Sequence, residues 1–223
     1  MRMRKKKHGA ERMQACDDIW IREPSEHLGK WRALAQESFE VDAETAQDIK
    51  LCLEIGCGKG TFVCEMAKRH PECFFVAVEK VPDVVLLAME KAKTAELSNV
   101  VFVNGDASTL TEAFAEGELD EIYLNFSDPW PKKGHAKRRL THRNFLAVYN
   151  KILSDNGALF FKTDNRPLFD FSLEEMTEFG LKLSDITFDL HNSPYEADNI
   201  HTEYENTFSA RGYTINRVVA RKK

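Results

Sequence analysis

The fold is decided by one stretch of the chain, Leu53-Glu54-Ile55-Gly56-Cys57-Gly58-Lys59-Gly60. A short apolar run, Leu51–Ile55, leads into these glycines, and a helical pattern follows over residues 61–69. A buried parallel strand has this kind of continuous apolar run. Glycine then lets the backbone turn tightly and approach a ligand where a Cβ would collide. The stretch therefore predicts a strand, a ligand-binding turn and a helix.

Further strands and helices alternate after this unit. Apolar runs predict strands over Cys73–Val78, Val100–Val103, Ile122–Phe126 and Ala158–Lys162. Helical patterns cover residues 82–97, 140–153 and 167–179. Alternation of this kind predicts a parallel sheet in an α/β fold. Residues 213–220 follow a helix by a short connection, which favours a final antiparallel strand. The predicted fold class is α/β, Rossmann-like, with a largely parallel sheet.

The length of 223 residues fits one domain, which we expect over residues 13–223, behind a flexible basic arm over residues 1–12. Hydrophobic residues make up 43%, enough for a sizeable core. No apolar stretch is long enough to span a bilayer, and no apolar segment follows the basic start as in a secretory signal. We therefore expect a cytoplasmic protein, either a monomer or a homodimer.

The five cysteines contain no C-x-x-C pair. Reduced, buried thiols are therefore expected, and no metal site is predicted.

The net charge of −5 hides two basic segments. Residues 1–12 hold six Lys or Arg and one acid, and residues 130–143 hold six Lys or Arg, two His and no acid. The rest of the chain is strongly acidic. Each segment alone is compatible with an ordinary solvated surface, but the two together favour contact with a nucleic acid.

Three acids follow successive predicted strands, namely Glu54, Glu79 and Asp106. The carboxyl ends of parallel strands meet at the edge where ligands bind, so these acids are expected to converge. An acid just before the glycines suits a cationic ligand better than a pyrophosphate, and S-adenosylmethionine carries a sulfonium and an ammonium group. A dinucleotide loop requires G-x-G-x-x-G, which fails here because Thr61 follows Gly60. The residues assigned to S-adenosylmethionine are Glu54, Gly56, Gly58, Gly60, Glu79 and Asp106.

The loop after the fourth predicted strand contains Asp128 between Ser127 and Pro129, followed by Trp130 and Pro131. The prolines fix their own φ and push the preceding residues toward extended conformations. A carboxylate held at this edge is able to stabilise positive charge on a methylated base. The basic stretch that follows, Gly134–Arg139, suits phosphate contact.

Two later segments carry further candidates. Asp164 follows the fifth predicted strand, where it either accepts hydrogen bonds from guanine N1–H and N2–H₂ or caps the next helix. Thr202 and Glu205 have the spacing of a capping box.

Together these residues resemble the bacterial tRNA (guanine-N7)-methyltransferase family, TrmB, from about Leu51 to Val219. Many methyltransferases share the glycine loop, whereas Asp128-Pro129-Trp130-Pro131-Lys132 and Thr202-Glu203-Tyr204-Glu205 are far more specific. The resemblance implies a class I S-adenosylmethionine-dependent methyltransferase that modifies N7 of a guanine in the variable loop of tRNA.

The resemblance also implies a role for each matching residue. It makes Asp128 the catalytic residue and a cofactor contact. It assigns the substrate to Lys132, Asp164, Thr202, Glu203, Tyr204 and Glu205. It assigns RNA contact to Gly134, His135, Ala136, Lys137, Arg138 and Arg139.

Three alternatives remain open at this point. One is another class I methyltransferase that acts on an exocyclic amine or a protein side chain, since Asp128–Trp130 loosely resembles the Asn-Pro-Pro-aromatic motif of amino methyltransferases. Asp128 in place of the Asn disfavours it. Another is a non-catalytic RNA-binding protein with this fold, which the complete set of acids disfavours. The third is a nicotinamide-dependent oxidoreductase, which the glycine spacing disfavours.

Overall fold

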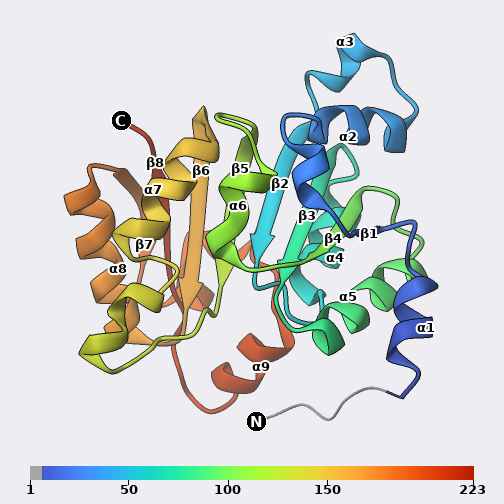
Figure 1. The fold of residues 1–223 in the computed structure, drawn as a ribbon. Helices are drawn as coiled ribbons and strands as arrows, with labels where there is room; N and C mark the ends of the chain where they lie inside the picture. Colours follow the sequence, from blue (N-terminus) through green and yellow to red (C-terminus); the bar gives the residue numbers. More distant parts are fainter. Residues whose placement is uncertain (1–6) are drawn as a thin grey trace. The chain divides into compact units, whose positions relative to one another are not determined.

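The computed structural model describes residues 7–223, which form two compact units that meet in sequence between Ala115 and Glu116 (Figure 1). The first six residues of the predicted basic arm lie outside the described residues.

The first unit contains a parallel sheet with the strand order β1-β4-β3-β2. Its strands are β1 (Trp20–Ile21), β2 (Lys50–Ile55), β3 (Cys73–Glu79) and β4 (Val100–Asn104). Its α-helices are α1 (Gly9–Gln14), α2 (Trp31–Phe39), α3 (Ala43–Ala46), α4 (Thr61–Arg69), α5 (Pro82–Thr94) and α6 (Leu110–Ala113). Two 3₁₀ turns are η1 (Pro24–His27) and η2 (Ala107–Thr109). Since β2, β3 and β4 are buried almost throughout, their continuous apolar runs were sufficient to predict them.

Residues 9–12 differ from the flexible arm expected over residues 1–12. They belong to α1, whose Met13 is buried and whose Arg12 donates from Nε and Nη2 to the Glu90 carboxylate on α5, at 2.7 and 2.6 Å. This long-range pair ties the segment to α5, and the local composition of residues 1–12 carries no sign of it.

Residues between the arm and β2 pack within the first unit. Trp31 is fully buried, its indole Nε1 donates to the carbonyl oxygen of Ala113 at 2.8 Å, and its ring stacks on Phe114 with centroids 5.0 Å apart. A buried indole needs a partner for its N–H, so this bond fixes α2 against α6.

The second unit has the strand order β5-β6-β8-β7. Its strands are β5 (Leu119–Asn125), β6 (Leu153–Thr163), β7 (Lys182–Thr187) and β8 (Asn216–Arg221). Its α-helices are α7 (Arg143–Ile152), α8 (Arg166–Phe179) and α9 (Glu203–Ser209), and its 3₁₀ turns are η3 (Lys133–Arg138), η4 (Leu190–Asn192) and η5 (Pro194–Glu196). Strands β5 and β6 are parallel, whereas β8 runs antiparallel to both β6 and β7. The α/β class and the final antiparallel strand are confirmed.

Two strands, β1 and β7, were not predicted from the sequence. β1 has two residues, too few to show a periodicity, and β7 has mostly half-buried side chains without an apolar run. All five cysteines are buried, as expected. Among the described residues, no helix has the length and apolar character needed to cross a membrane.

Candidate functional site

In the first unit, the glycine loop is anchored to the end of β3. The amides of Gly56 and Cys57 both donate to the carbonyl oxygen of Val78, at 2.8 and 3.1 Å. Ile55 pairs with Val78 in the parallel register, and Glu79 pairs with Asn104. The predicted convergence at one sheet edge is therefore present for the ends of β2, β3 and β4.

Glu79 is held in place from several sides at this edge. Its Oε2 accepts from the Gly58 amide at 3.2 Å, and its Oε1 accepts from the Val81 amide at 2.9 Å. The side chain of Asn104 donates to the Glu79 carbonyl at 2.8 Å. Glu79 thus links the glycine loop to the start of α5 and to β4, which gives its carboxylate a defined orientation.

Asp106 follows β4 and stays ionised. Its Oδ1 accepts from the amide and the hydroxyl of Ser108, at 2.9 and 2.8 Å, and these bonds lower its pKa. Lys80 lies 3.9 Å from the other carboxylate oxygen.

The glycine loop lies in a negative electrostatic environment. Glu54, at the end of β2, is only 3% exposed. Burial raises the pKa of the Cys57 thiol, and the nearby carboxylates of Glu54 and Glu79 raise it further. Carboxylates that oppose ionisation of a neighbouring thiol favour a cation at the same place.

The glycines themselves differ in what surrounds them. Gly56 and Gly58 have φ of +77° and +56°, and a Cβ added at either would meet no atom within 4 Å. Gly60 also has a positive φ, +74°, but its Cβ would lie 2.8 Å from the Cβ of Ala88 on α5. Open space beside Gly56 and Gly58, next to carboxylates, fits a cationic cofactor such as S-adenosylmethionine. Gly60 instead permits the close approach of α4 to α5.

This difference predicts distinct effects for two alanine variants. Gly58→Ala should cost about 1–2 kcal/mol of stability through its left-handed backbone, and the new methyl should weaken S-adenosylmethionine binding about tenfold or more. Gly60→Ala should lower the unfolding midpoint further, because Ala88 also has to shift. Thermal unfolding and calorimetric titration of the cofactor would measure both. Equal effects of the two variants on stability and on binding would contradict this distinction.

In the second unit, the loop that carries Asp128 has a residue with positive φ on each side of that aspartate. Phe126 and Trp130 have φ of +54° and +41°, which non-glycine residues adopt rarely, and the Phe126 amide donates to the Lys162 carbonyl at 3.0 Å. Asp128 is exposed between them. Burial raises the pKa of the Tyr204 hydroxyl, and the carboxylates of Asp164 and Asp128 raise it further. These three predicted site residues therefore lie in one neighbourhood.

Asp164 is half-buried, and burial raises the pKa of its carboxyl. The alternative that Asp164 caps the next helix is wrong. Asn165 is the N-cap of α8, and its Oδ1 accepts from the Leu168 amide at 2.9 Å. The carboxylate of Asp164 is thereby left for another role.

The Thr202–Glu205 segment forms one of the two hydrogen bonds of the predicted capping box. Thr202 is the N-cap of α9, and its Oγ1 accepts from the Glu205 amide at 3.0 Å. The Glu205 carboxylate turns into the protein instead, where it is fully buried and lies 2.6 Å from Nζ of Lys162. Tyr204 is 44% exposed and stacks on Phe208 with centroids 4.2 Å apart.

Lys162 is a site residue that sequence reasoning missed. It lies within β6, and its Nζ also donates to Asn199 Oδ1 and to the Ile200 carbonyl, both at 2.8 Å. Lys162 therefore holds the segment before α9 against the strand that leads to Asp164. A lysine at the end of an apolar strand run was the available signal, since lysine is almost never fully buried without a partner.

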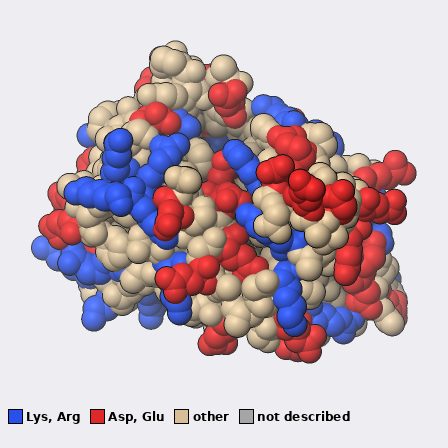
Figure 2. All heavy atoms as spheres, turned by 90° about the horizontal axis from the view of Figure 1, so that it is seen from above, with Lys and Arg blue, Asp and Glu red and all other residues tan. Residues whose placement is uncertain are grey.

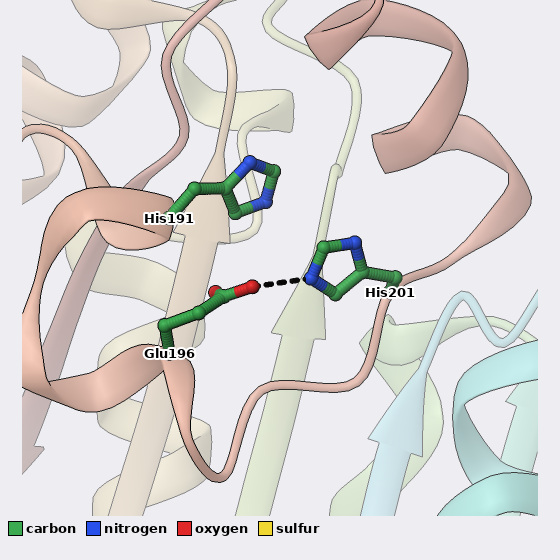
Figure 3. Close-up of side chains that lie close together, drawn as sticks. All are labelled: His191, Glu196 and His201. Atoms are coloured by element: carbon green, nitrogen blue, oxygen red, sulfur yellow. Dashed lines mark hydrogen bonds and ion pairs between the residues drawn. The ribbon is translucent and has the colours of Figure 1, made fainter.

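Figure 3 shows a cluster of His191, Glu196 and His201. His191 also contacts Glu205, which the figure does not draw. His201 Nε2 lies 2.5 Å from Glu196 Oε1, and His191 Nε2 lies 2.8 Å from Glu205 Oε1. The imidazole rings are 8° from parallel, with centroids 4.7 Å apart. A metal ion lies near the plane of each imidazole that binds it, at about 2.1 Å. Two nearly parallel, stacked planes do not offer one such point, so this arrangement is a hydrogen-bonded cluster.

The cluster predicts a pH-dependent contribution to stability. Burial lowers the pKa of His201, but its bonds to Glu196 and Asn206 outweigh that effect, so the pKa is raised. A raised folded-state pKa stabilises the fold fully below the unfolded value of about 6.5, and this stabilisation is lost as the pH rises through the folded value.

His201→Gln should therefore lose more stability relative to the parent protein at pH 5.5 than at pH 8.5. Urea unfolding at both pH values would measure this difference. A stability gap that is independent of pH would rule out the assigned role of the His201–Glu196 pair.

The predicted RNA-contacting stretch forms η3 and the residue after it. Lys137 and Arg138 are exposed, and the Arg138 guanidinium lies over the Trp130 ring, 4.9 Å from its centroid. His135 meets the same ring edge-on at 5.7 Å. Figure 2 shows that Lys and Arg side chains gather in several places on the face seen from above, with Asp and Glu side chains close beside them.

The fold and the site define a class I methyltransferase. A family model described as "Putative methyltransferase" matches residues 48–218. Among solved structures, an antibiotic-related methyltransferase is 17% identical with a TM-score of 0.58, covering 79% of this chain and 89% of that chain. The 16S rRNA methyltransferase KamB is 16% identical with a TM-score of 0.57, covering 82% and 90%. At such identities these likenesses concern the fold alone.

More similar relatives identify the family. The chain is 43% identical to a tRNA (guanine-N(7)-)-methyltransferase of Bacillus cytotoxicus, over 99% of this chain and 97% of that protein. It is 45% identical to a protein of the same name from Geobacillus sp., over 97% of this chain and 94% of that protein. The chain belongs to the tRNA (guanine-N7)-methyltransferase family.

Proposed function

We propose that this protein transfers the methyl group of S-adenosylmethionine to N7 of a guanine in the variable loop of tRNA. The observation that carries the proposal is the common neighbourhood of Asp128, Asp164 and the Tyr204 hydroxyl, in a chain of this family. When bound, S-adenosylmethionine supplies an electrophilic methyl group on its sulfonium. Glu54, Gly56, Gly58, Glu79 and Asp106 would hold it.

The chain's own residues then position the base. Guanine N7 has a lone pair and no proton, so its attack on the methyl needs no strong base. The protein has to align the reacting atoms and stabilise the positive charge that develops on the base. An exposed carboxylate at Asp128 suits this electrostatic role.

Recognition of guanine falls to the neighbouring residues. The Asp164 carboxylate suits the N1–H and N2–H₂ donors, and the exposed ring of Tyr204 offers a stacking surface for a base that has left its stack. Lys132 and Lys137 are exposed and suit phosphate contact. Glu205, which the resemblance assigned to the substrate, has its carboxylate bound by Lys162 and His191. We propose that it shapes the site by holding Thr202 and Tyr204.

The decisive experiment measures transfer of a labelled methyl group to unmodified tRNA, followed by nucleoside mass spectrometry of the product. We expect 7-methylguanosine, lost when the variable-loop guanine is replaced by adenine. Another methylated nucleoside would support a different RNA methyltransferase, and binding without transfer would support the non-catalytic alternative. Action in the cytoplasm on tRNA belongs to this proposal.

A further inference from the structure

We propose that Arg139 is a positioning residue that holds the Asp128 loop in shape through the backbone of Pro129 and Trp130. The resemblance had placed Arg139 among the RNA contacts, together with Lys137 and Arg138. The structural role stands on geometry alone, whereas its consequence for catalysis rests on the proposed function of Asp128.

The guanidinium of Arg139 spans two consecutive carbonyls of the loop. Its Nε donates to the Pro129 oxygen at 3.0 Å, and its Nη2 donates to the Trp130 oxygen at 3.1 Å. Its Cζ lies 4.3 Å from the centroid of the Phe171 ring on α8. The Phe171 ring packs against one face of the planar guanidinium, while two N–H donors at the edge of the guanidinium bind the loop. Arg139 therefore connects the Asp128 loop to α8.

The loop needs an external donor because it is poor in donors of its own. Pro129 and Pro131 have no N–H, so the loop offers few backbone donors for its own carbonyls. Trp130 has a φ of +41°, a strained conformation that persists only where the surroundings enforce it. Arg139 binds the carbonyl oxygens before and after the Trp130 Cα atom, which is where that enforcement is required.

Neighbouring basic residues contact different parts of the loop. Arg138 lies over the Trp130 ring and remains exposed, and Lys137 is exposed on η3. Arg139 is half-buried and directs two donors to the backbone. Only Pro129 separates Asp128 from Trp130, so a change in the Trp130 backbone moves the carboxylate of Asp128.

The variants Arg139→Lys and Arg139→Gln separate charge from geometry. Lysine keeps a positive charge for phosphate contact but lacks the rigid planar guanidinium, so it should not bind the Pro129 and Trp130 carbonyls together. We expect turnover to fall on the order of 100-fold in both variants, the effect of misplacing a catalytic group by about 1 Å. The KM for tRNA should stay within about threefold of the parent value. The salt dependence of RNA binding should equal that of the parent protein within experimental error.

Lys137→Gln is the contrasting variant. It should weaken RNA binding, raise the KM for tRNA and reduce the slope of log affinity against log salt by about one. If Arg139→Gln instead shows this pattern while Arg139→Lys behaves like the parent protein, Arg139 is a phosphate contact and the proposal is overturned.

A second measurement requires neither cofactor nor RNA. Trypsin cleavage after Lys132 or Lys133, identified by fragment mass, should be several-fold faster in both Arg139 variants under native conditions. The urea unfolding midpoint, measured in parallel, shows whether the remaining fold is intact. Unchanged cleavage in a folded Arg139→Gln variant overturns the proposal. Because this readout is independent of methyl transfer, it decides the role of Arg139 even if the proposed function fails.

Discussion

The Asp128→Asn variant is expected to fold and to bind S-adenosylmethionine while its turnover falls by about 100- to 1000-fold, the range for losing one electrostatic stabiliser of a transition state. The substitution keeps the shape of the side chain and removes its charge. Asp128 is exposed and lies close enough to Tyr204 to affect its pKa, so the lost charge faces the neighbourhood assigned to the target base.

Asp155→Asn is the matched control for this result. Asp155 belongs to the same unit, its side chain is fully exposed, and its carboxylate lies 3.5 Å from Lys222. The control should keep parental turnover, because the same chemical change then occurs on an open surface. Single-turnover rates with saturating tRNA, together with calorimetric titration of the cofactor, would separate chemistry from binding. Near-parental turnover of Asp128→Asn would refute the electrostatic role.

The Lys162→Met variant is expected to lose about 3–5 kcal/mol of unfolding free energy, the usual result of removing one partner from a buried ion pair. The Lys162 and Glu205 side chains are 6% and 0% exposed. Methionine has a similar length but no charge, so it leaves the Glu205 carboxylate buried without its cation. Urea unfolding at neutral pH would measure the loss.

The stability difference should also depend on pH. Burial raises the pKa of Glu205, but Lys162 and the bonds from Asn199 and His191 lower it by more, so the net shift is downward. A lowered folded-state pKa stabilises the protein above the unfolded value, and this stabilisation is lost as the pH falls through the folded value. The gap between parent and Lys162→Met should therefore shrink at acid pH.

Two companion variants test the cause. Glu205→Gln combined with Lys162→Met removes the stranded charge and should recover part of the loss. Lys151→Met, at an exposed position on α7, should change stability by less than about 0.5 kcal/mol. A Lys162→Met variant within 1 kcal/mol of the parent protein would show that the pair does not stabilise the second unit.

Much of the site was predictable because it depends on local sequence. Glu54, Glu79 and Asp106 each follow a buried strand, and parallel pairing brings such strand ends to one edge whatever the details of packing. The position of these acids and glycines at one edge of the first unit's sheet could therefore be predicted without a structure. The position of Asp164 after a strand could be predicted for the same reason, although its alternative role as a helix cap was excluded only by the bond from the Leu168 amide to Asn165.

By itself, the sequence determined the strand–glycine loop–helix unit, the alternation of strands and helices and the residues at the strand ends, since these follow from periodicity and backbone freedom. Tertiary structure alone decided that Lys162 binds Glu205 and that Arg12 on α1 binds Glu90 on α5. It also decided that Arg139 binds the backbone of the Asp128 loop. The Arg12–Glu90 and Lys162–Glu205 contacts join residues far apart in the chain. The Arg139 contact depends on the exact backbone of a proline-rich loop. The sequence of a charged residue is the same whether its side chain faces solvent or binds a buried partner. Only the folded structure shows which of these two environments the side chain has.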